Sequence, residues 1–117
     1  MAVVDDERDM VDLIVRVLYL NNIPVCFKSY DGDEALRKFR ECTLKPKVII
    51  IDYRMPSITG MEAMIKMRQM HEGVNFIFLS ADSGMKNDVL QAGASKFLVK
   101  PVSMRDLVIA VEQVAEI

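Results

Sequence analysis

The 117-residue sequence has one histidine, two cysteines and no long apolar run. Cys26 and Cys42 are too far apart for a C-x-x-C motif, and His71 has no zinc-ligand spacing to either of them. A membrane helix needs roughly 18 or more apolar residues in a row, and no signal-peptide pattern is present. These absences predict a cytoplasmic protein whose thiols are reduced.

An excess of one charge is also lacking, because 15 lysines and arginines stand against 17 aspartates and glutamates. The net charge of −2 gives no reason to expect direct binding to nucleic acid or a membrane surface. Neither G-x-G-x-x-G nor G-x-x-x-x-G-K-[ST] occurs, so these nucleotide-binding loops are excluded. Hydrophobic residues make up 51% of the chain, enough for one core, and the length predicts a single domain over residues 1–117.

Five apolar segments alternate with five segments of helical periodicity. The spacing predicts strands over 1–4, 23–29, 48–51, 74–79 and 97–99, and helices over 7–21, 32–45, 60–71, 83–92 and from 104 onward. Pro24 and Lys28 favour an edge position for the second strand. Because β-α-β crossovers are right-handed, this order predicts an α/β fold with helices on both faces of a parallel sheet.

Helix faces and caps follow from the same periodicity. The first helix is expected to bury Met10, Leu13, Ile14, Val17 and Leu18, the second Ala35, Leu36 and Phe39, and the third Met61, Met64 and Ile65. Capping-box patterns occur at Asp31 with Glu34 and at Ser103 with Asp106. The fourth helix has few apolar positions, and we expect it to be mobile.

Polar residues follow four of the predicted strands at the points where the strands end. They are Asp5 and Asp6, Asp52, Ser80 and Lys100. The carboxyl ends of parallel strands share one rim, so these side chains should converge. Asp52 alone could be a capped structural aspartate, but clustered carboxylates need a hard cation such as Mg²⁺. Together with an ammonium and a hydroxyl group, they suit transfer of a phosphoryl group to a carboxylate.

The motifs VVDDE, IIIDYRMP, FLSADS and FLVKP, in this order over essentially the whole chain, resemble the receiver domain of two-component response regulators. The resemblance implies a flavodoxin-like, doubly wound (βα)5 three-layer sandwich. Its parallel sheet would have the strand order 2-1-3-4-5. The protein would be a phosphoacceptor signalling domain that assists only its own phosphorylation and dephosphorylation, not an enzyme acting on other substrates.

The resemblance also implies a role for each matching residue. Asp52 would accept the phosphoryl group, and Ser80 and Lys100 would each bind a phosphoryl oxygen. Phe97 occupies the switch-aromatic position, and the bond between Lys100 and Pro101 is a candidate cis peptide. The Mg²⁺ ligands, with Mn²⁺ or Ca²⁺ as substitutes in vitro, would be Asp6, Asp5 directly or through water, Asp52 and the backbone carbonyl of Arg54.

Partners and regulation follow from the same likeness. A sensor histidine kinase would donate the phosphoryl group, and the face of the fourth helix, fifth strand and fifth helix would signal onward. Arg54 and Asp82 could pair across the site and modulate dephosphorylation. The output could be a separate target or a fused domain. The domain could also form a homodimer when it is phosphorylated.

Two other readings remain open. A pseudo-receiver that acts only as an interaction module would be expected to lack the acceptor or the lysine, and this chain has both. A haloacid-dehalogenase-like phosphatase would carry a second aspartate where this chain has Arg54.

Overall fold

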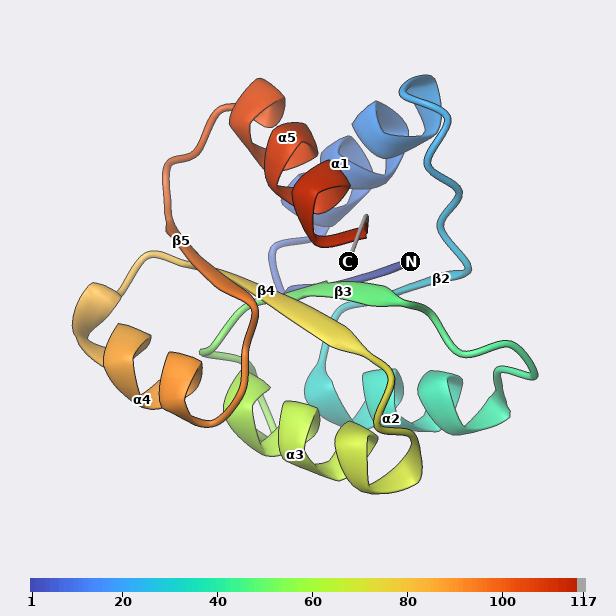
Figure 1. Ribbon diagram of the computed structural model, residues 1–117, viewed down its shortest axis with the longest axis vertical. Helices are drawn as coiled ribbons and strands as arrows, with labels where there is room; N and C mark the ends of the chain where they lie inside the picture. The colour runs from blue at the N-terminus through green and yellow to red at the C-terminus, as the bar shows by residue number, and fades with distance from the viewer. Residues whose placement is uncertain (116–117) are drawn as a thin grey trace.

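The computed structural model describes residues 1–115 and shows a five-stranded parallel sheet between two layers of helices (Figure 1). The strands are β1 (Ala2–Val4), β2 (Phe27–Ser29), β3 (Val48–Ile51), β4 (Asn75–Ser80) and β5 (Lys96–Val99). The helices are α1 (Arg8–Leu20), α2 (Gly32–Glu41), α3 (Gly60–Met70), α4 (Lys86–Gln91), preceded by the 3₁₀ turn η1 (Ser83–Met85), and α5 (Met104–Ala115). The strand order β2-β1-β3-β4-β5 confirms the predicted flavodoxin-like fold.

Each face of the sheet carries its own hydrophobic core. Helices α1 and α5 cover one face, and α2, α3 and α4 cover the other (Figure 1). Every residue of β3 is buried, and its side chains alternate between the two cores. This explains the uninterrupted aliphatic run before Asp52, because a strand covered on both faces has no solvent side to carry polar residues. No helix among the described residues is long and apolar enough to cross a membrane.

Both edge strands are short. The prediction of a strand over residues 23–29 was right about the edge position but too long, because only Phe27–Ser29 pair with β1. Pro24 has no N–H to donate to a ladder, and the chain before β2 instead runs as a loop in which the Cys26 N–H donates to the Met1 carbonyl at 2.8 Å. On this strand Lys28 is exposed and pairs with Asp12 of α1 at 2.9 Å.

The predicted buried faces of α1 and α3 were partly wrong. In α1 the buried residues are Val11, Ile14 and Leu18, whereas Leu13 is 48% exposed. This helix contacts the sheet on one side and α5 on another, so residues on its outer flank stay in solvent. In α3, Ile65 is likewise exposed, and the buried residues are Ala63, Met64 and Met67. The predicted core of α2, by contrast, is confirmed in full.

Helices α2, α3 and α5 begin at side-chain caps. Asp31 accepts the Glu34 N–H at 2.7 Å, but the Glu34 carboxylate bonds to the Ser29 hydroxyl and the Tyr30 N–H, so the predicted box is only half formed. Ser103 similarly accepts the Asp106 N–H at 3.0 Å. A reciprocal capping box forms at α3, between Thr59 and Glu62, at a position not predicted from the sequence.

Candidate functional site

The rim at the carboxyl ends of the strands is fixed by backbone hydrogen bonds that extend the sheet. The Asp5 N–H donates to the Ser29 carbonyl at 3.1 Å, and the Asp52 N–H donates to the Val4 carbonyl at 3.0 Å. On the other side the Lys100 N–H donates to the Ser80 carbonyl at 2.9 Å. The four predicted strand-end positions are therefore held side by side before any side chain is considered.

Lys100 is the centre of the charged cluster on this rim. Its Nζ lies 2.9 Å from Asp5 Oδ2, 2.8 Å from Glu7 Oε1 and 3.5 Å from Asp52 Oδ2. The carboxylates of Asp5 and Asp52 are almost fully buried, whereas Glu7 is exposed. One ammonium thus meets three carboxylates in a partly buried site, which leaves an excess of negative charge.

The buried charges shift the pKa values of this cluster. Burial raises the pKa of Asp5 to about 6, and the nearby Asp52 charge adds to the increase. Hydrogen bonds from the Glu7 N–H and from Lys100 oppose this rise. For Lys100, burial works against the charged form, but the hydrogen bonds to Glu7 and Asp5 outweigh it and raise the pKa of the ammonium group. Lys100 therefore stays protonated in the site.

The carboxylate oxygens of Asp5, Glu7 and Asp52 lie within 4.8 Å of one another. Such an all-oxygen set, with negative charge in excess of the one lysine, fits a hard divalent cation such as Mg²⁺. Asp6 is exposed and lies outside this group, and its role as a metal ligand remains a prediction, as does that of the Arg54 carbonyl.

Ser80 ends β4 beside Lys100, and Phe97 lies on β5 three residues before Lys100. Ser80 is buried at the end of β4, and its hydroxyl accepts the Asp82 N–H at 3.4 Å. Phe97 of β5 points into the core and stacks on Phe78, with ring centroids 6.3 Å apart. The Lys100–Pro101 peptide bond is cis.

Arg54 and Asp82 meet at the outer margin of the site. Arg54 Nη2 lies 2.7 Å from Asp82 Oδ2; the Arg54 side chain is exposed, and Asp82 is half-buried. The Arg54 hydrogen bond, followed by that from the Gly84 N–H, lowers the pKa of Asp82. The Arg54 side chain therefore bridges the loop after β3 to the turn that opens η1.

The loop that carries Arg54 is anchored by Gly60 at the start of α3. The Gly60 N–H donates to the Tyr53 carbonyl at 2.7 Å, and a Cβ at this position would collide with the carbonyl oxygen of Asp52. The backbone of the candidate acceptor is thus packed directly against the first residue of α3.

Sequence reasoning missed Glu7. The signal was present, since Glu7 follows Asp5 and Asp6 directly, but only a turn brings its side chain back to Lys100. That turn is made by the Glu7 N–H, which donates to Asp5 Oδ1 at 3.0 Å.

The chain is similar to known proteins in sequence and in fold. The family model for the response regulator receiver domain matches residues 1–112. The transcriptional regulatory protein PrrA of Mycobacterium leprae is 37% identical over 114 residues, covering 96% of this chain but 48% of PrrA. The chemotaxis protein CheY of Listeria monocytogenes is 29% identical over 118 residues, covering 99% of this chain and 98% of CheY.

A solved structure supports the same assignment. The response regulator TrrA of Thermotoga maritima, determined in complex with Mg²⁺ and BeF, is 28% identical, with a TM-score of 0.84 and coverage of 97% of this chain and 96% of TrrA. With a family model that spans nearly the whole chain and a matching fold, this protein belongs to the response regulator receiver domain family of two-component signalling.

Proposed function

We propose that the domain accepts a phosphoryl group on Asp52 from the phosphohistidine of a sensor histidine kinase, or from a small phosphodonor, in a Mg²⁺-dependent reaction. The observation that carries this proposal is the position of Lys100, whose ammonium group lies between Asp5, Glu7 and Asp52. A fixed cation beside a buried carboxylate offsets the charge that would repel an incoming phosphoryl group.

In the proposed reaction the Asp52 carboxylate attacks phosphorus, and an O–P bond forms as the P–N bond of the phosphohistidine breaks. Asp5, Asp6 and Asp52, with the carbonyl of Arg54, would hold Mg²⁺, which supplies positive charge against the phosphoryl oxygens. Lys100 moves its contacts from the carboxylates to one phosphoryl oxygen. The Ser80 hydroxyl, whose hydrogen-bond acceptor role toward Asp82 leaves its proton free to donate, binds another.

The recruitment of Ser80 would pull the turn after β4 toward Asp52. Phe97, now stacked on Phe78, would rotate into the space that the turn vacates. The face of α4, β5 and α5 would change shape as one packing becomes more populated than the other. Having no hydroxyl group, Phe97 would signal by packing alone.

The proposed partners are a sensor histidine kinase and an output domain or a separate downstream target. PrrA, a transcriptional regulatory protein, is about twice the length of this chain, which supports a fused output domain. The match to CheY covers 98% of that protein, so a separate downstream target is proposed beside a fused output domain. With or without a fused output domain, this protein would act in the cytoplasm. A phosphorylation-dependent homodimer is a further proposal.

The alternative functions have weaker support. The pseudo-receiver reading is disfavoured by Asp52 and Lys100, which lie close enough to act together. The phosphatase reading needs an acid at residue 54, where the arginine side chain turns outward to Asp82. Steady turnover of a phosphate ester would be required to revive it.

The deciding experiment uses acetyl phosphate with Mg²⁺ and reads the product by intact mass. Wild type should gain one phosphoryl group, removal of Mg²⁺ with a chelator should prevent the gain, and Asp52→Asn should not be labelled. Absence of labelling in wild type, or undiminished labelling of Asp52→Asn, would overturn the proposal.

The lifetime of the phosphoryl group tests the pair of Arg54 and Asp82. If their ion pair obstructs the approach of water, the double variant Arg54→Ala/Asp82→Ala should lose the phosphoryl group faster than wild type. An Arg37→Ala/Glu41→Ala variant, which removes another exposed ion pair on α2, serves as the control. If all three proteins lose the phosphoryl group at the same rate, the ion pair does not obstruct the approach of water.

A further inference from the structure

Glu7 belongs to the charged cluster on the rim but has no part in the phosphoryl transfer proposed for Asp52. Its Oε1 atom lies 2.8 Å from Lys100 Nζ, which is the shortest of the three contacts between this ammonium group and carboxylates. Asp5 Oδ2 follows at 2.9 Å, whereas Asp52 Oδ2 is 3.5 Å away, near the outer limit of a hydrogen bond. Lys100 is therefore held most closely by two carboxylates other than the candidate acceptor.

The two close partners of Lys100 differ in how easily they can release it. The Asp5 side chain is 3% exposed, and its other oxygen already accepts the Glu7 N–H at 3.0 Å. The Glu7 side chain is 58% exposed, so water can replace the ammonium group as its partner. A buried carboxylate that loses its cation has no such replacement. The contact with Glu7 is thus the one that breaks at the lower cost when Lys100 moves.

Glu7 also occupies a position that would suit a different contact. It is the N-cap residue of α1, where a side-chain oxygen commonly accepts an N–H of the first helical turn. The Glu7 side chain makes no such bond and reaches instead to Lys100, which directly follows β5. The length of a glutamate side chain is used here to join the start of α1 to the end of β5.

We propose that Glu7 is a positioning residue, which holds the Lys100 ammonium group away from Asp52 until a phosphoryl group arrives. This role depends on the phosphoryl transfer proposed for Asp52. In the resting domain the Glu7 carboxylate competes with Asp52 for Lys100. During transfer Lys100 leaves Glu7 for a phosphoryl oxygen, and the exposed Glu7 carboxylate turns to water. Because this contact must break first, Glu7 slows phosphorylation of the domain.

A second role for Glu7 has to be distinguished from this one. The carboxylate oxygens of Asp5, Glu7 and Asp52 lie within 4.8 Å of one another, which is also an arrangement that suits ligands of Mg²⁺. The two roles predict opposite results when the charge of Glu7 is removed. Loss of a metal ligand would slow phosphorylation, whereas loss of the contact that holds Lys100 would accelerate it.

The first test measures the rate of labelling by acetyl phosphate and Mg²⁺, read by intact mass. Glu7→Gln should be labelled about 3-fold faster than wild type, because Lys100 no longer has to leave an ion pair. Glu41→Gln is the matched control, since the Glu41 side chain is 60% exposed and its carboxylate lies 2.9 Å from Arg37 Nη1. This control should be labelled at the wild-type rate.

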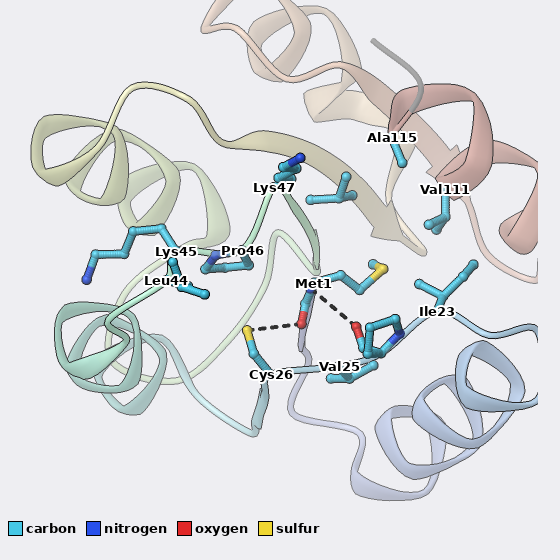
Figure 2. Close-up of a pocket in the computed structure, with 12 residues that line it drawn as sticks. Met1, Ile23, Val25, Cys26, Leu44, Lys45, Pro46, Lys47, Val111 and Ala115 are labelled. Carbon is cyan, nitrogen blue, oxygen red and sulfur yellow. Dashed lines mark hydrogen bonds between the residues drawn. The ribbon is translucent and has the colours of Figure 1, made fainter.

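The control lies at the other end of the sheet. Glu41 is the last residue of α2, and the chain after it, with Leu44 and Lys45, lines a cavity of about 500 Å³ beside Met1, at the amino ends of the strands (Figure 2). Glu41→Gln removes one negative charge from the domain without touching Lys100. A difference between the two glutamine variants is therefore due to the place of the charge.

Glu7→Asp separates the contact with Lys100 from simple repulsion of the incoming anion. Aspartate keeps the negative charge but is shorter, and at an N-cap position it favours a bond to the first turn of α1. Glu7→Asp should therefore release Lys100 and be labelled faster than wild type, as Glu7→Gln is. If only Glu7→Gln is faster, the charge of Glu7 acts by repulsion and the proposal is wrong.

Two measurements need no phosphodonor. The ¹⁵N NMR signal of the Lys100 ammonium group should shift in Glu7→Gln and in Glu7→Asp, but not in Glu41→Gln. The dissociation constant for Mg²⁺, from a titration followed by amide signals, should rise less than about 3-fold in Glu7→Gln, since an exposed charge is screened by water and salt. Loss of a metal ligand would raise it at least about 10-fold.

The outcomes separate this proposal from the function on which it depends. A wild-type protein that gains no phosphoryl group overturns both. Normal labelling of wild type, combined with equal or slower labelling of Glu7→Gln, overturns only the role of Glu7. An unchanged Lys100 signal in Glu7→Gln, or an affinity for Mg²⁺ that is weaker by about 10-fold or more, does the same. Melting curves of the variants establish that each is folded.

Discussion

Helices α3 and α4 cover the same face of the sheet but are held to it very differently. Helix α3 has 11 residues, a reciprocal capping box at Thr59 and three buried side chains beyond Gly60. Helix α4 has six residues, begins from a 3₁₀ turn and buries only Val89. One long capped helix thus stands beside one short helix with little buried area (Figure 1).

The difference separates the part of the molecule that must stay fixed from the part that can move. Gly60 of α3 packs against the backbone of Asp52, so movement of α3 would displace the candidate acceptor. Helix α4 has few buried contacts, and segments of this kind open at low free-energy cost. A signal that starts at Asp52 would therefore reach solvent-exposed structure most easily through α4.

The largest expected effect comes from truncating a buried side chain of α3. Met64→Ala should lower the free energy of unfolding by about 3 kcal/mol, because Met64 is fully buried and its removal leaves a cavity. Ile65→Ala, at the exposed neighbouring position, should change it by less than about 1 kcal/mol. Denaturant unfolding measures both. Equal losses would mean that the originally predicted face, with Ile65 buried, is correct.

A somewhat smaller loss is expected at the junction between α3 and Asp52. Gly60→Ala should cost about 2 kcal/mol, because its methyl group meets the Asp52 carbonyl and the Phe78 ring and forces the two segments apart. Gly73→Ala is the control, since there the methyl group would meet only the exposed His71 side chain. If both variants unfold at the same denaturant concentration as wild type, α3 does not hold the acceptor backbone.

The smallest effect should be confined to α4. Arg68 of α3 donates to the carbonyls of Ala92 and Gly93, just beyond α4, and to that of Val74. Arg68→Met keeps most of the side-chain volume but removes these bonds, so amides of residues 86–91 should exchange with solvent about 5-fold faster.

Arg37→Met, which breaks an exposed ion pair on α2, is the matched control for that measurement and should leave exchange in α4 unchanged. If Arg68→Met accelerates amide exchange equally over the whole domain, the variant destabilises the protein in general, and Arg68 does not hold α4 in particular.

The parallel sheet and most of the residues at its carboxyl rim could be predicted from the sequence. Asp5, Asp52, Ser80 and Lys100 could be brought together because each ends a strand, and strand ends in a parallel sheet meet at one edge. Pro24 and Lys28 also marked the second strand as an edge strand, whereas the full strand order was implied by the family resemblance. These inferences use only the period and order of the elements, which local composition encodes directly.

The remaining features depend on how elements dock. Leu13 has the spacing of a core residue, yet it stays exposed because no neighbour among residues 1–115 covers that flank of α1. The exposure of Ile65 likewise depends on which flank of α3 faces the sheet. Residue spacing carries no signal for either fact.

The two short edge strands have a consequence for the behaviour of the protein in concentrated solution. Open sheet edges expose unpaired backbone groups that can recruit the edge of another molecule. Here each edge offers only three or four residues, β2 places the charged Lys28 at its middle, and β5 begins with Lys96. Two molecules that approach edge to edge could therefore form only a short ladder, and the ion pair of Lys28 with Asp12, at 2.9 Å, would stand beside it. The same sheet that aligns the site residues therefore offers little edge on which a fibre could grow.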